Sequence, residues 1–235
     1  MTARRVLFVA GSHTEIGKTH VACEILRAGA QAGWTVDALK PVVSGFDPDA
    51  WSDSDPGRLI AACGWEASEA VLARLSPWRY RAPLAPPLAA QAEGQSIDFA
   101  AVVEFCRRRI AESEADLMVV EGVGGLMSPI AAAATSLDLL TALTSDSVLV
   151  GGGYLGAVSH TLTALEVMRQ RGLAPAALVI SQSEDPEAPD FASTLALVEA
   201  HAAGCPVFAA PRRTGDPWPA ALLQTVFGAP AVVTL

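Results

Sequence analysis

The first apolar run is followed by three residues, Gly17, Lys18 and Thr19, whose types and spacing suit the binding of a phosphate group. The stretch RVLFVAGSHTEIGKTH passes from a predicted strand, through Gly17, Lys18 and Thr19, into a predicted helix. In that order the backbone N–H groups and the helix N-terminus face one anion. Lys18 would add positive charge at the β- and γ-phosphates, and the Thr19 hydroxyl could bind magnesium. An ordinary strand-to-helix turn is the alternative, because the usual first glycine of this pattern falls on Ser12, one residue after Gly11.

Four more polar side chains follow predicted strands or lie in the connections between them. Lys40 and Ser44 follow the second strand, Glu121 ends a later one, and Asp55 lies in a long connection. Open α/β sheets bind ligands at the carboxyl ends of their strands. There Lys40 could stabilise charge during phosphoryl transfer, while Glu121 and Asp55 could face magnesium. The plainer interpretations are a solvated strand end for Lys40, an N-cap for Asp55 and an edge carboxylate before a glycine-rich turn for Glu121.

The loop also contains Thr14 and Glu15. A carboxylate inside a phosphate loop repels the ligand unless it serves the metal or a second substrate that carries an amine. The four histidines show no metal-ligand spacing, so we interpret them as solvated or hydrogen-bonded side chains.

Apolar runs alternate with helical periodicity along most of the chain, which predicts an α/β fold with a mostly parallel sheet flanked by helices. The predicted strands are 6–10, 36–39, 117–120, 147–150, 177–180 and 206–209. The predicted helices are 18–32, 99–111, 137–143, 157–171 and 190–202. The segment 41–94 departs from this alternation of strands and helices. We predict substrate contacts there, and the alternative is a surface decoration without a function.

The composition restricts the class of protein. A chain of 235 residues with 51% hydrophobic and 17% charged residues predicts one domain, residues 1–235, around a sheet buried on both faces. The net charge of −9 argues against nucleic-acid or anionic-membrane partners. Four scattered cysteines predict neither a zinc site nor disulfides, and no segment reads as a signal peptide or membrane span, so we expect a cytoplasmic protein.

Taken together, five motifs resemble the dethiobiotin synthetase family, whose fold is that of the P-loop NTPases. They are GSHTEIGKT at 11–19, KPVVSG at 40–45, SD at 54–55, VEGVGG at 120–125 and GYLG at 153–156. The resemblance extends along most of the chain in the same order. It implies a homodimer with the diamine site at the subunit interface, and ATP and Mg²⁺ as cofactors. Its substrates would be 7,8-diaminopelargonate and CO2, joined through a carbamate and a carbamic-phosphoric anhydride.

The resemblance also implies roles for individual residues. The catalytic set is Thr14, Glu15, Lys18 and Lys40, and the magnesium ligands are Thr19, Asp55 and Glu121. The nucleotide-binding set is Glu15, Ile16, Gly17, Lys18, Thr19, His20, Asp55, Glu121, Gly122, Val123, Gly124, Ser181, Gln182 and Pro211. The substrate-binding set is Ser44, Gly125, Tyr154, Leu155 and Gly156.

The sequence departs from the family pattern at several of these positions. His13 replaces a common loop aspartate, the region 83–87 lacks two polar side chains, and Phe191 stands where an interface tyrosine is usual. Ser181 and Gln182 occupy the positions at which the family often has an Asn-Asp pair that contacts adenine. Because serine offers fewer directed hydrogen bonds than asparagine, we predict a looser nucleotide preference, extending from ATP to other nucleoside triphosphates.

Three other classes of protein compete with this interpretation. Partition and division-site switch ATPases have a second lysine in the loop where this chain has His13, and this chain has no basic amphipathic C-terminal helix. Cobyrinate amidotransferases add a glutaminase domain, for which 235 residues leave no room. A nucleotide-binding protein without catalysis stays open at this stage.

Overall fold

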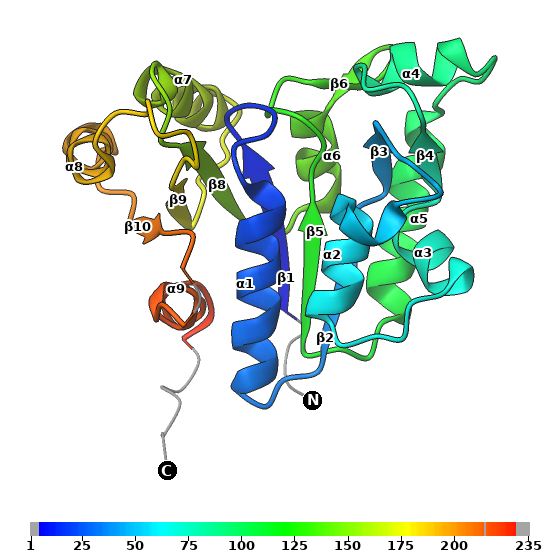
Figure 1. The fold of residues 1–235 in the computed structure, drawn as a ribbon, viewed down its shortest axis with the longest axis horizontal. Coiled ribbons are helices and arrows are strands. Elements are labelled where there is room, and N and C mark those ends of the chain that lie inside the picture. The colour runs from blue at the N-terminus through cyan, green and yellow to red at the C-terminus, as the bar shows by residue number, and fades with distance from the viewer. Residues whose placement is uncertain (1–4, 214, 229–235) are drawn as a thin grey trace.

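In the computed structural model, which describes residues 5–213 and 215–228, a six-stranded parallel sheet runs through the centre of the molecule (Figure 1). The strand order is β10-β9-β8-β1-β5-β2. The bounds are β1 Arg5–Gly11, β2 Val36–Leu39, β5 Leu117–Glu121, β8 Asp146–Gly152, β9 Ala177–Ser181 and β10 Val207–Ala210. All six predicted strands are present to within two residues, so the predicted mostly parallel α/β fold is confirmed.

Helices cover both faces of this sheet (Figure 1). One hydrophobic cluster joins the sheet to α1 Lys18–Gln31, α2 Asp55–Ala62, α3 Glu69–Leu75 and α9 Trp218–Phe227. The other joins it to α5 Phe99–Glu112, α6 Ser136–Leu143, α7 Ala157–Gln170 and α8 Phe191–His201. The described helices are too short or too polar to cross a lipid bilayer.

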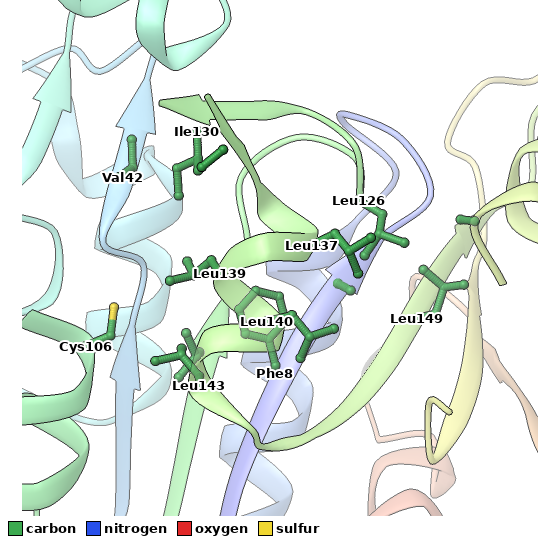
Figure 2. Close-up of a cluster of buried hydrophobic side chains, with 14 of the residues drawn as sticks. Phe8, Val42, Cys106, Leu126, Ile130, Leu137, Leu139, Leu140, Leu143 and Leu149 are labelled. Atoms are coloured by element: carbon green, nitrogen blue, oxygen red, sulfur yellow. The ribbon is translucent and has the colours of Figure 1, made fainter. Parts of the chain in front are cut away.

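The central strand β1 supplies both hydrophobic clusters, because successive side chains of a strand point to opposite faces. Leu7 and Val9 belong to the cluster under α1, and Phe8 and Ala10 belong to the cluster under α6. Figure 2 shows the leucines of α6 gathered over the Phe8 ring. β1 is therefore fixed from both sides, and the loop that follows it starts from a rigid position.

The segment 41–94 is structured and does not form an open loop. It contains β3 Val42–Ser44, a 3₁₀ turn at Trp51–Asp53, α2, α3, β4 Trp78–Tyr80 and α4 Pro86–Ala92. Strands β3 and β4 pair in parallel as a separate two-stranded sheet. A short hairpin of β6 Pro129–Ala131 and β7 Ala134–Thr135 follows the glycine-rich turn after β5. None of these short strands is in the predicted set.

Candidate active site

The loop between β1 and α1 contains two residues in the left-handed region. Glu15 has a φ of 56° and Gly17, the N-cap residue of α1, has a φ of 96°. A side chain at Gly17 would overlap the Ser181 hydroxyl and would come within 2.9 Å of the Arg212 guanidinium. Glycine is thus required here for two reasons. It adopts the left-handed backbone angle without strain, and it lets β9 and the segment after β10 approach the loop closely.

Lys18 is 6% exposed and lies back across the end of β1. A Cβ at Gly11 would lie 2.6 Å from the Lys18 Cδ, so Gly11 leaves room for the lysine stem. The Lys18 ammonium donates a hydrogen bond to the His13 carbonyl at 3.0 Å. Gly11 therefore has a packing role although it lies one residue before the usual glycine of the phosphate loop.

Lys40 is the centre of a buried charge cluster and is 3% exposed. Its ammonium donates to Glu121 Oε1 and lies 2.8 Å from Asp55 Oδ2. The Thr19 hydroxyl donates to the same Glu121 oxygen at 2.7 Å. Four side chains from four separate segments thus meet at the carboxyl edge of the sheet. The interpretation of Lys40 as a solvated strand end is therefore wrong.

The end of α3 holds the Lys40 backbone. The Lys40 N–H donates to the Leu75 carbonyl at 3.2 Å, and the Ser76 hydroxyl donates to the Lys40 carbonyl. Ser76 is fully buried. The segment 41–94 therefore contributes to the site by fixing Lys40 as well as by supplying Asp55 and Ser44.

Asp55 is the first residue of α2, and the N-cap is Ser54. The Ser54 hydroxyl accepts a hydrogen bond from the Gly57 N–H at 3.4 Å. The Asp55 carboxylate is thus available to Lys40, and the interpretation of Asp55 as a helix N-cap is wrong.

Burial and mutual charge shift the pKa values of this cluster. Burial and the neighbouring Lys40 lower the pKa of Lys18 to about 8. Burial alone would lower the pKa of Lys40, but Glu121 and Asp55 outweigh it and raise that pKa. Burial opposes ionisation of Asp55 as well, yet Lys40 brings its pKa to about 2. Burial raises the pKa of Glu121. Lys40 and Asp55 are therefore a firmly charged pair at neutral pH.

A cavity of about 690 Å³ opens above this cluster. Its charged side chains include five Lys and Arg residues and four acids, so it carries a small positive excess in a chain of net charge −9. The predicted site residues on its wall are Thr14, Glu15, Gly17, Lys18, Thr19, His20, Lys40, Ser44, Asp55, Glu121, Val123 and Gly124. These residues come from distant parts of the chain, so the structure brings together most of the predicted catalytic, metal and phosphate-binding residues.

The other predicted residues do not line this cavity. They are Ile16, Gly122, Gly125, Tyr154, Leu155, Gly156, Ser181, Gln182 and Pro211. Ser181 is 1% exposed and lies against Gly17. The Gln182 side-chain oxygen accepts the Arg212 N–H at 3.3 Å, and the Pro211 carbonyl lies 3.2 Å from His20 Nε2.

Four charged wall residues were absent from the sequence prediction. They are Arg27, Arg58, Glu184 and Arg212. Arg212 had a usable signal, since it directly follows Pro211 in AAPRR. The others belong to helices or loops whose residue types alone predict only solvent exposure.

The residues present fit a magnesium ion. Glu121 Oε2 is buried and has no hydrogen-bond partner among the described residues, although its other oxygen has two. Thr19 and Asp55 add a hydroxyl and a carboxylate, the hard oxygen ligands that Mg²⁺ prefers. The described residues contain no group of three His, Cys, Asp or Glu side chains that could hold a metal.

The start of α7 lies beside the phosphate loop but outside the cavity wall. Gly156 is its N-cap residue, with a φ of 94°, and the preceding Leu155 is 87% exposed. The Tyr154 hydroxyl lies 2.7 Å from His160 Nδ1, and the His160 ring stacks on His13 with centroids 5.4 Å apart. An aromatic and imidazole cluster therefore connects α7 to the phosphate loop.

Comparisons with known proteins decide the family. A family model described as an AAA domain matches residues 5–210. An ATP-dependent dethiobiotin synthetase from Phenylobacterium zucineum is 52% identical over 219 residues, which cover 93% of this chain and 94% of that protein. The chain belongs to the ATP-dependent dethiobiotin synthetase family. Another member, from Caulobacter vibrioides, is 50% identical, with 88% of this chain and 92% of that protein covered.

Solved structures share the fold of this family member at much lower identity. A ParA family ATPase from Chlorobium tepidum superposes with a TM-score of 0.52 at 14% identity, covering 97% of this chain and 90% of that chain. At such identity the likeness shows the fold alone. It confirms the predicted P-loop NTPase-like architecture, and the sequence identity to the synthetases sets the switch-ATPase alternative aside.

Proposed function

We propose that this chain closes the ureido ring of dethiobiotin from 7,8-diaminopelargonate, CO2 and ATP, releasing ADP and phosphate. The observation that carries the proposal is the meeting of Lys18, Lys40 and Glu121 in one cavity beside the phosphate loop. Family membership supplies the substrates, and the cavity supplies the charges that their chemistry requires.

The reaction proceeds in three steps. One amine of the diamine attacks CO2, forming a C–N bond and losing a proton to give a carbamate. A carbamate oxygen then attacks the γ-phosphorus of ATP, and the bond to ADP breaks. The second amine attacks the carbonyl carbon of the resulting anhydride and loses a proton, forming the second C–N bond, and phosphate leaves with the original carbamate oxygen.

The two lysines stabilise the charge on the transferred phosphoryl group. The Lys18 ammonium uses one donor on the His13 carbonyl, and the Lys40 ammonium uses two donors on Asp55 and Glu121. An ammonium has three donors, so each lysine keeps at least one for a phosphate oxygen. Charges that are already in place need no reorganisation during the reaction. Such electrostatic stabilisation, together with positioning of the reactants, is the main source of catalysis in phosphoryl transfer.

Thr19, Asp55 and Glu121 would hold the magnesium ion, with Glu121 Oε2 as the free carboxylate oxygen. Bound Mg²⁺ would neutralise charge on the β- and γ-phosphate oxygens. Their positions support this assignment, because Thr19 lies in the first turn of α1 and Glu121 at the end of β5, next to β1 in the sheet.

Glu15 and Ser44 lie on the wall of the same cavity and would contact the diamine. The Glu15 carboxylate suits a protonated amine of the diamine, which carries the opposite charge. Leu155 and the start of α7 would belong to the dimer interface, where N–H groups in the first turn of α7 would bind the substrate carboxylate. Four free cysteines agree with the cytoplasm as the site of action.

Phosphate release tests the proposal. Purified protein with ATP and Mg²⁺ is given the diamine alone, bicarbonate alone, or both. We expect inorganic phosphate and a ring-closed product only when both are present. Phosphate release that needs neither substrate would contradict the proposal and favour a nucleotide-driven switch.

A Lys18→Gln protein provides the second arm of the test. We expect its ring-closing rate to fall by orders of magnitude, because the γ-phosphate loses a charge that the transition state needs. Full activity in Lys18→Gln would refute the assignment of the phosphate loop. Arg5, which lies at the opposite end of β1, gives the matched control Arg5→Gln, and its ring-closing rate should match that of the unaltered chain.

A further inference from the structure

Arg212 is one of three arginines on the cavity wall that the proposed function leaves without a role. It follows β10, is half-buried, and lines the cavity with Arg58 and Glu184. Its guanidinium lies over Gly17, because a Cβ at Gly17 would come within 2.9 Å of Arg212 Nη2. Gly17 caps the helix whose first N–H groups face the phosphate site. Arg212 thus lies at the N-terminus of α1, the end of the helix that attracts anions.

Among the described residues, Nε is the one guanidinium nitrogen of Arg212 with a hydrogen-bond partner. Arg212 Nε donates to the Gln182 carbonyl at 2.9 Å, and the Arg212 backbone N–H donates to the Gln182 side-chain oxygen at 3.3 Å. Arg212 forms no salt bridge with a carboxylate in the part of the chain that the structure describes. Its two terminal nitrogens therefore remain as a directed pair of donors on the cavity side.

Two of the three groups expected to contact the base already have hydrogen-bond partners. The Gln182 side-chain oxygen accepts from the Arg212 N–H, whereas the buried Ser181 hydroxyl, which lies against Gly17, has no hydrogen-bond partner among the described residues. The Pro211 carbonyl lies within hydrogen-bond distance of the His20 ring. A nucleobase would therefore compete with the Arg212 N–H for the Gln182 side-chain oxygen, whereas an anion could bind the terminal nitrogens of Arg212 without displacing a hydrogen bond among the described residues.

We propose that Arg212 is an affinity determinant that binds the phosphates of the nucleotide and makes no distinction between bases. The inference rests on the proposed function, in which a nucleoside triphosphate occupies this cavity. An arginine fork matches the geometry of a phosphate group, and charge-assisted hydrogen bonds of this kind are among the strongest in proteins. Binding energy taken from phosphate and not from base gives a physical reason for a broad nucleotide preference.

Calorimetric binding with Arg212→Gln tests this, with Arg213→Gln as the matched control. Arg213 is the next residue, its side chain is 80% exposed, and it pairs with Asp216 at 3.2 Å. Both variants remove one positive charge from the same segment. Each is titrated with ATP, CTP, GTP, inorganic tripolyphosphate and adenosine, and urea unfolding of each variant checks that the fold is kept.

We expect Arg212→Gln to weaken the three nucleotides and tripolyphosphate by a similar factor, roughly tenfold or more, and to leave adenosine unchanged. Arg213→Gln should bind all five ligands as the unaltered chain does. A loss confined to one nucleotide would overturn the inference in favour of base reading, and equal binding by both variants would overturn it as well. Either of these leaves the proposed function standing, whereas an unaltered chain that binds no triphosphate would overturn both.

Discussion

Replacing Lys40 by Met tests the buried charge cluster through the stability of the protein. Lys40 is 3% exposed and Glu121 is 1% exposed, so the substitution leaves a buried carboxylate without its cation. Breaking a buried ion pair by removing one partner costs about 3–5 kcal/mol. Asp55 adds little to this cost, because its side chain is 42% exposed and water can solvate it. We expect the free energy of unfolding to fall by about 3–5 kcal/mol for Lys40→Met.

Urea unfolding at pH 7 without metal measures this change, and a double variant sharpens it. In Lys40→Met with Glu121→Leu both charges are gone, so most of the lost stability should return. Ring closure should stay abolished in both variants, because neither keeps the lysine that faces the phosphate. A Lys40→Met protein as stable as the unaltered chain would refute the buried pair, and so would a double variant less stable than the single one.

Three further predictions concern single contacts. Gly17→Ala should lower the free energy of unfolding by about 1–2 kcal/mol because of its φ of 96° alone, and by more because the new methyl group overlaps the Ser181 hydroxyl. In urea titrations, adding Ser181→Gly should restore only the stability lost to that overlap. Arg109→Met leaves the buried Asp37 unpaired and should cost about 3–5 kcal/mol, with the ring-closing rate per folded molecule unchanged, because Arg109 does not line the cavity. Asp138→Ala removes the capping box of α6 and should cost about 1 kcal/mol at pH 7. Hydrogen bonds at the N-cap lower the pKa of Asp138 below 3.8, so its contribution is present above that value and is lost as the pH falls through the lowered pKa; a stability difference that stayed constant into acid would contradict it.

The long elements of the fold could be predicted because each buries a periodic apolar pattern. Strands such as 117–120 are continuous apolar runs, and helices such as 157–171 repeat apolar residues every three to four positions. The short strands β3, β4, β6 and β7 have two or three residues, too few for any period to appear. The helix α9 was missed because a proline stands in its first turn, at Pro219, although its residues Leu222 and Leu223 are buried.

The meeting of polar residues at the carboxyl ends of the strands could be predicted from the sequence. The contacts of the residues expected near the nucleobase could not. Lys18 and Lys40 follow strands of one parallel sheet and Glu121 ends another, so the topology itself brings them together. The contact of Ser181 with Gly17 depends on how closely β9 approaches the phosphate loop, which no residue type reveals. Likewise, Arg212 faces the cavity because Gln182 holds its Nε atom. The single-domain organisation and the individual roles stay predictions.

The convergence of two ammonium groups on one phosphoryl group is the central claim, and a crystal structure with three ligands tests it most directly. The protein would be crystallised with Mg²⁺, a non-hydrolysable ATP analogue and 7,8-diaminopelargonate. We expect the γ-phosphate within hydrogen-bond distance of both Lys18 and Lys40, and the metal bound by Thr19, Asp55 and Glu121. A γ-phosphate that contacts Lys18 but lies out of reach of Lys40 would contradict the account.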